Sequence, residues 1–215
     1  GTLANLTLVD EDDLVLGGAT VSTALSVNAQ GGITQTGGLL AFSATFDAGA
    51  QTPGINDITL SGSNDFDSLS ITNGGDVTVV DVDELSLGVA NVGGAFNVTA
   101  VGIDVTGAIT TATLDFDGSG GNIEDTSGSV SVSGLANFTV TGANTIDLDA
   151  TSNDFATITV SADTGDVDFV DIDDISLGSI SVNGSLSIDA AGIDITGSVV
   201  VDDAILDATG GNITD

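Results

Sequence analysis

The sequence predicts an all-β fold, a parallel β-helix (β-solenoid) of about 19 residues per turn and about eleven turns. Three observations predict it. The composition is that of a β protein, an internal repeat changes its spacing by about one turn, and short alternating segments are separated by turn-forming residues. We expect residues 1–215 to form one continuous solenoid with a superrepeat of about 90 residues.

The composition combines a high apolar content with an unusual charge. The 215 residues include 32 acidic residues and no Lys, Arg or His, which gives a formal net charge of −32. High charge with low hydrophobicity indicates disorder, but 41% of these residues are hydrophobic. Val, Ile, Leu and Thr are spread along the chain and favour strands, whereas 30 Gly residues disfavour long helices. The composition therefore predicts a folded β protein.

One acidic segment occurs three times, at residues 9–17, 80–88 and 170–178. Its first aspartates are Asp10, Asp81 and Asp171, and the second interval exceeds the first by about 19 residues. We interpret this difference as one turn that the first block lacks, and other anchors place the gap between Asp47 and Asn64. A solenoid tolerates such a loss because each turn contacts only its neighbours.

The local pattern fits short strands joined by tight corners. Segments such as 158–160 and 186–189 alternate apolar and polar residues, which indicates strands with one buried face. The segments between them are rich in Gly, Asn, Asp and Ser and are too short to contain crossover helices. Five phenylalanines in strand-like segments are expected to stack in the core, namely Phe96, Phe116, Phe138, Phe155 and Phe169.

Residues 93–100 and 185–195 resemble the degenerate repeats of filamentous-haemagglutinin-like exoproteins, and the resemblance extends over essentially the whole chain. Those proteins are secreted bacterial adhesins built as right-handed β-helices. The resemblance therefore implies a right-handed parallel β-helix with an extracellular or cell-surface location. The Asn-Pro-Asn motif of that family's secretion domain is absent here, so the resemblance points to the rod region, which has no catalytic residues to carry over.

The sequence does not predict an enzyme. Without His, Cys, Lys, Arg or Tyr, most nucleophilic and acid–base arrangements cannot form. Paired carboxylates remain, as in glycosidases. Asp171 and Asp173 alternate with Val170 and Ile172, so we expect both carboxylates to point outward, where no apolar environment would keep one of them protonated.

Three acidic triplets are the candidate metal ligands, because carboxylate oxygens suit Ca²⁺. The triplets are Asp10, Asp12 and Asp13; Asp81, Asp83 and Glu84; and Asp171, Asp173 and Asp174. They are separated by several turns, so each would form a separate site. The alternative is a solvated acidic face that keeps the rod soluble. No cofactor is expected to be required, and Ca²⁺ is the one candidate.

The charge density is close to that of duplex DNA. About eleven turns at about 4.8 Å give a rod of roughly 53 Å, or about one charge per 1.7 Å. We expect a condensed cation atmosphere and a stability that depends on Ca²⁺, Mg²⁺ or salt. A DNA mimic that inhibits a DNA-binding protein stays open as an alternative, although the five-residue period of pentapeptide-repeat mimics is absent. Direct binding of nucleic acid is not expected, because no cationic side chain can contact phosphate.

These observations favour an extracellular structural or adhesive fibre protein, a rigid polyanionic rod for surface attachment or matrix scaffolding. Expected partners are other copies, joined end to end into a filament, and a host or neighbouring cell surface or matrix. The chain is expected to be a segment of a longer protein or a filament subunit. No apolar run approaches the roughly 18 residues of a membrane helix, so membrane insertion is not expected. Alternatives are a cation- or carbohydrate-binding module, a carbohydrate-active β-helix and an acidic halophilic protein.

Overall fold

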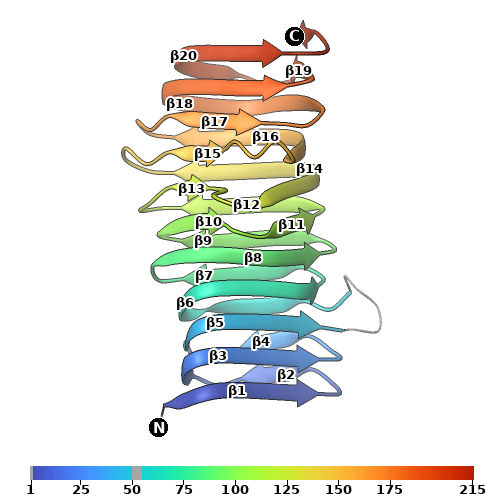
Figure 1. The fold of residues 1–215 in the computed structure, drawn as a ribbon, viewed down its shortest axis with the longest axis vertical. Helices are drawn as coiled ribbons and strands as arrows, with labels where there is room; N and C mark the ends of the chain where they lie inside the picture. Colours follow the sequence, from blue (N-terminus) through green and yellow to red (C-terminus); the bar gives the residue numbers. More distant parts are fainter. Residues whose placement is uncertain (1, 50–54) are drawn as a thin grey trace.

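The computed structural model describes residues 2–49 and 55–215 and shows a parallel β-solenoid of about eleven turns (Figure 1). Its strands form one parallel sheet that coils along the long axis, with the two ends of the chain at opposite ends of the rod. The strands are β1 (Leu3–Asp10), β2 (Leu14–Leu16), β3 (Ala19–Ala29), β4 (Ile33–Gln35), β5 (Leu39–Ala48), β6 (Ile58–Gly74), β7 (Val77–Asp81), β8 (Glu84–Val92), β9 (Ala95–Ala100), β10 (Gly102–Val105), β11 (Ala108–Thr111), β12 (Thr113–Gly118), β13 (Ile123–Glu124), β14 (Ser129–Val140), β15 (Ile146–Leu148), β16 (Asp154–Ala162), β17 (Val167–Val170), β18 (Asp174–Ala190), β19 (Gly192–Ile195), β20 (Val199–Ala208) and β21 (Ile213–Thr214). The all-β solenoid that the sequence predicts is confirmed, while its right-handed sense stays a prediction.

Stacked residues are one turn apart in the sequence, and the turn length varies. Leu6 of β1 pairs with Leu25 of β3, one turn further along the chain. Asp115 of β12 pairs with Asn137 of β14 across a longer turn. The predicted turn of about 19 residues is confirmed as the typical length. The additional residues of the longer turns lie between the segments that pair as strands.

The acidic repeat alternates between faces of the rod. Leu87 of the second copy pairs with Leu69 of the turn before. The equivalent residue of the third copy is Leu177, which pairs with Ile158. Ile158 belongs to a column of stacked residues that also contains Phe96. Phe96 follows Leu87 by about half a turn. The chain therefore makes about four and a half turns between the second and third copies, so these copies lie on different faces.

The first copy lies on the same face as the third. Leu14 begins the column that continues through Ile33, Ile58 and Val77 to Phe96, the column that also contains Leu177 of the third copy. The chain thus makes about three and a half turns between the first and second copies. This is one turn fewer than between the second and third copies. This agrees with the interpretation that the first block lacks a turn. The proposed gap, residues 47–64, includes residues 50–54, which lie outside the described residues.

The core is a continuous column of buried aliphatic and aromatic side chains. Five rings make successive contacts with centroids 5.2 to 6.1 Å apart, mostly edge to face, and these rings are Phe96, Phe116, Phe138, Phe155 and Phe169. A second pair, Phe46 and Phe66, stacks nearer the N-terminal end. The predicted aromatic stack in the core is therefore confirmed. Each such ring pair contributes about 0.5–1.5 kcal/mol beyond the burial of its area.

Candidate functional site

A row of carboxylates crosses four consecutive turns. Asp104 of β10 pairs with Glu124 of β13, which pairs with Asp147 of β15, which pairs with Asp168 of β17. In β10, β15 and β17 the acidic residue is flanked by inward-facing apolar residues, and in β13 Glu124 follows the buried Ile123, so each acidic side chain takes the outer face. Adjacent strands are about 4.8 Å apart, which places four negative charges in line at that spacing.

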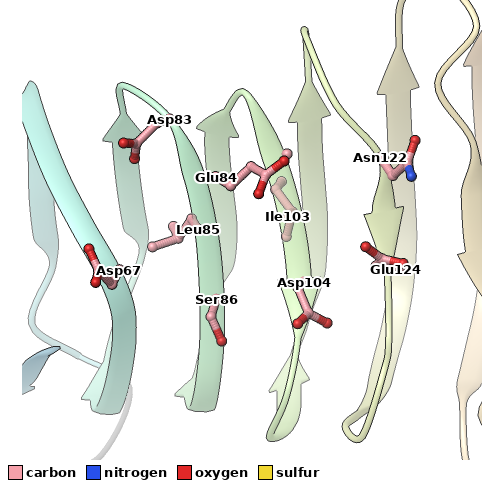
Figure 2. A pocket seen from close by; sticks show the side chains of 10 residues that line it. Asp67, Asp83, Glu84, Leu85, Ser86, Ile103, Asp104, Asn122 and Glu124 are labelled. Atoms are coloured by element: carbon pink, nitrogen blue, oxygen red, sulfur yellow. The ribbon is translucent and has the colours of Figure 1, made fainter. Parts of the chain in front are cut away.

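The row begins in a hollow of about 490 Å³ (Figure 2). Its acidic lining comes from Asp67 of β6, Asp83 and Glu84 at the start of β8, Asp104 and Glu124. Figure 2 shows these side chains arranged on neighbouring strands, with the carboxylate of Glu84 above Ile103 and the Asp104 carboxylate further along β10. Five carboxylates thus gather over four strands.

Crowding and partial burial disfavour ionisation of the two central members of the row, Glu124 and Asp147. Burial raises the pKa of Glu124, and the charges of Asp104, Asp147 and Glu84 raise it further. Burial likewise raises the pKa of Asp147, with added repulsion from neighbouring aspartates. No basic side chain exists in the chain to offset these charges. The arrangement attracts cations to this face through its summed field.

The acidic row does not amount to a compact coordination site. Within residues 2–49 and 55–215, no group of three or more acidic side chains is arranged to hold a metal ion. Of the three predicted triplets, only Asp83 and Glu84 contribute to the hollow. The predicted calcium binding by these triplets stays a prediction.

The expectation that Asp171 points outward with Asp173 is wrong. Asp171 is only 5% exposed, and the intervening Ile172 is 59% exposed. The alternation breaks because the chain turns a corner here, and the Asp171 carboxylate accepts the backbone N–H groups of Phe155 at 2.6 Å and Asp173 at 3.0 Å. Burial, as the main cause, raises the pKa of Asp171 to about 6.

Asp81 of the second triplet is turned inward in the same way. Its carboxylate accepts the backbone N–H groups of Phe66 at 3.0 Å and Asp83 at 3.3 Å. Burial raises the pKa of Asp81 to about 7. Asp10 of the first triplet accepts the N–H of Asp12 at 2.9 Å and is partly buried. The first aspartate of each triplet therefore shapes a corner, and the residues after it are exposed.

Two buried asparagines complete these corners. The Asn64 side chain accepts the backbone N–H of Leu39 at 3.0 Å, donates to the Leu60 carbonyl at 2.9 Å and bonds to the Gln35 amide in both directions. Gln35 also donates to the Gly37 carbonyl at 2.7 Å. Asn64 is fully buried, so these bonds satisfy polar groups that water cannot reach. The corner joins three turns.

Asn153 occupies the equivalent place in the later block. It accepts the backbone N–H of Val130 at 2.8 Å and donates to the Leu148 carbonyl at 3.0 Å. It also donates to the Asp125 carboxylate at 2.7 Å, where the earlier corner has Gln35. We name the two arrangements the Asn64 corner (Gln35, Asn64 and Asp81) and the Asn153 corner (Asp125, Asn153 and Asp171).

Sequence reasoning missed the acidic row and the corners. The signal for the row is an apolar–acidic pair that returns after about one turn, as in Ile103-Asp104, Ile123-Glu124 and Ile146-Asp147. The signal for the corners is the Asn-Asp-Phe tripeptide, present after Ser63 and again after Ser152. Nothing in the sequence alone shows that the Asn of this tripeptide is buried.

A family model described as repeats of unknown function (DUF5649) matches residues 3–73, 74–120, 100–162 and 164–214. These matches together cover nearly all of the chain, and two of them overlap over residues 100–120. Neither the curated proteins nor the solved structures include a significant match. Within the described residues, no helix has the length and apolar character needed to cross a bilayer.

Proposed function

Since the chain belongs to the DUF5649 family of repeats of unknown function, we propose that it is an extracellular structural or adhesive fibre protein, a stiff polyanionic rod for surface attachment or matrix scaffolding. One observation carries the proposal, the unbroken stack of parallel turns around a continuous core. Each turn bonds to the turns on either side, so load along the axis is distributed over many backbone hydrogen bonds.

The acidic outer surface supports a role in which the rod stays apart from other polyanions, including other copies of itself. With 32 acidic residues and no basic ones, the rod repels other copies of itself sideways and gathers counterions. The carboxylate row, as a linear array, concentrates this charge on one face. Lateral association of rods is thereby disfavoured at low salt. This property suits a spacer that must stay separate from its neighbours.

Association along the axis is part of the proposal. Among the described residues, β1 pairs only with β3 and β20 only with β18, so each has an edge of unpaired backbone groups. Such edges template pairing with another strand. Exposed apolar side chains, such as Val9 and Ile205, lie on these terminal turns. The proposed occupant is another solenoid turn, from a second copy or from a further stretch of the same chain.

Electron microscopy of the purified chain, with and without calcium, tests this function. We expect thin unbranched filaments whose width is that of one rod, and no turnover of polysaccharides supplied as substrates. Compact particles under every condition, or reproducible cleavage of a glycan, would contradict the proposal. Discrete particles that bind a DNA-processing enzyme would favour the DNA-mimic alternative.

Thermal unfolding tests the polyanionic character separately. We expect the melting temperature to rise on going from low salt with a chelator to millimolar calcium, because counterions reduce the repulsion among carboxylates. Sodium chloride at matched ionic strength distinguishes general screening from a preference for divalent ions. An unchanged melting temperature across these conditions contradicts the expected cation dependence.

A further inference from the structure

One outer side of the rod, over β7, β9, β12, β14, β16 and β18, is nearly free of charge, although the net charge of the chain is −32. Outward residues alternate there with buried ones and stack from turn to turn. They form three columns, which we name the neutral face: Thr78, Asn97, Asp115, Asn137 and Thr159; Val80, Thr99, Asp117, Thr139, Ser161, Ser181 and Val200; and Leu135, Thr157 and Ser176. Asp115 and Asp117 are the only carboxylates in these columns.

The neutral face contrasts with the acidic row, where each of four successive turns contributes a carboxylate. Both carboxylates of the neutral face lie on one strand, β12, and the Asn137 side chain donates to Asp115 at 2.7 Å. Repulsion between two rods is smallest where the facing surfaces contain the fewest charges. The neutral face is therefore the side on which a second copy can approach most closely.

The order of residues along the columns selects an antiparallel pair. If a two-fold axis crosses the pair at β14, each turn before β14 faces the turn equally far after β14 in the second rod. Asp115 then lies opposite Thr159 and Asp117 opposite Ser161, so hydroxyl donors meet carboxylate acceptors. In a parallel pair with its turns level, Asp115 lies opposite Asp117 of the second rod, and two like charges meet.

The same axis brings apolar side chains together. Val80 lies three turns before Thr139 and Val200 three turns after it, so the two valines face each other across the pair. Val200 is 59% exposed, and Leu135, which lies on the axis, is 45% exposed. Leu135 faces its own copy, beside two Asn137 amides that can each donate and accept. The pair thus covers exposed apolar surface and matches its polar groups.

The contact area is sufficient for a weak, specific pair. Seven strands at about 4.8 Å and five residues at about 3.3 Å give a face of roughly 34 Å by 17 Å. The two rods together bury roughly 1,150 Å², just above the 1,000 Å² or so expected of a biological interface. Like charges meet at the rim, where Asp76, beside Ala95, lies opposite Asp194. Salt that screens these charges and the remaining surface is therefore required.

We propose that two copies of this chain pair side by side and antiparallel through the neutral face when salt screens the acidic remainder of the rod. This lateral contact goes beyond the proposed association along the axis, because it uses a different surface and does not involve the terminal turns. It allows a rod that stays separate at low salt to bundle as the ionic strength rises.

Sedimentation of the full chain at increasing sodium chloride tests the pairing. We expect single rods at low salt and a doubled mass by about 1 M, where the screening length is about 3 Å. Thr139→Asp places two carboxylates opposite each other on the axis and is expected to weaken pairing at least tenfold. The matched control is Ser187→Asp, which adds the same charge beside Asp168 on the acidic side and leaves pairing unchanged. No pairing of the wild type up to 1 M salt, or equal effects of the two variants, overturns the proposal.

A milder variant keeps the test valid if Thr139→Asp does not fold. Leu135→Ser replaces a side chain that is 45% exposed in the single rod, so the melting temperature at low salt is expected to stay the same. The salt concentration at which half of the rods pair is expected to rise, because the apolar contact on the axis is lost. Pairing at the wild-type salt concentration contradicts the proposed axis.

A spin label at a single introduced cysteine distinguishes the possible pairs. Ser61→Cys lies on the same outer side, one turn before Val80 and just outside the contact. The antiparallel pair places the two labels eight turns apart, about 38 Å. A parallel pair places them close to the roughly 10 Å spacing of packed sheets, and end-to-end association about one rod length apart, roughly 53 Å. A distance near 38 Å that appears only at high salt supports the proposal, and either of the other two distances alone overturns it.

Discussion

At the Asn64 corner the asparagine amide bonds to neutral Gln35, whereas at the Asn153 corner it bonds to the carboxylate of Asp125. The backbone N–H groups that each asparagine accepts, from Leu39 and Val130, are otherwise equivalent. The difference follows from one additional residue in the later corner, which directs more donors inward. The comparison shows that corner length selects the chemistry of the buried partner, while the asparagine itself is common to both.

The aromatic surroundings of the two corners differ as well. Phe66, beside the Asn64 corner, has one ring neighbour, Phe46, at 6.1 Å. Phe155, beside the Asn153 corner, contacts Phe138 at 5.8 Å and Phe169 at 5.7 Å. The later corner is therefore embedded in a longer aromatic stack, and we expect it to contribute more to the stability of the rod.

Truncating these two rings is expected to have the largest effect. Phe155→Ala and Phe66→Ala each remove a fully buried ring, with an expected loss of about 3–5 kcal/mol in the free energy of unfolding. Phe155→Ala is expected at the upper end, because it removes two ring contacts. Denaturant titration measures both, and a larger loss for Phe66→Ala contradicts the ranking.

Removing the corner asparagines is expected to have the next largest effect. Asn153→Ala and Asn64→Ala leave buried donors and acceptors unsatisfied, with an expected loss of about 2–4 kcal/mol. At neutral pH we expect Asn153→Ala to be the more damaging, because it leaves a charged partner without its donor. The exposed Asn91→Ala serves as the control. Equal losses at the two corners would show that the charge of Asp125 has little influence.

The inward aspartates give a pH dependence common to both corners. With the pKa of Asp81 raised to about 7 and that of Asp171 to about 6, the folded chain binds protons that the unfolded chain releases. Stability is expected to rise as the pH falls from about 7 towards the ordinary aspartate value of about 4. Asp81→Asn is expected to remove the upper part of this rise and Asp171→Asn the lower part. Melting curves at fixed salt across this range measure it, and stability that falls steadily on acidification refutes the sign.

The smallest expected effect concerns the outer row. Glu124→Gln removes one carboxylate from between Asp104 and Asp147 and is expected to stabilise the chain by less than about 1 kcal/mol at low salt. High salt is expected to abolish this gain, since exposed charges are screened, while the corner effects persist. A gain that survives high salt means that Glu124 behaves like a buried corner residue.

The sequence is sufficient to predict the solenoid, the typical turn length and the aromatic stack, because each depends on a period that survives along the whole chain. The inward turn of Asp171 was not predictable from alternation, since alternation holds within a strand and fails at a corner. The acidic row was not predictable either. The turn from Ile123 to Ile146 is several residues longer than the turn from Leu85 to Ile103, so the register cannot be extrapolated from one turn to the next.

The rod is one continuous stack in which successive acidic repeats lie on alternate faces. Because the chain has no Cys, pairs of introduced cysteines at Val15, Ser86 and Ser176 can carry spin labels without interference. We expect a distance of about 38 Å between Val15 and Ser176, which lie on one face about eight turns apart. We also expect the two shorter distances to sum to clearly more than this, because each crosses the rod. Distances that add along a single line would place all three repeats on one face and contradict the alternation.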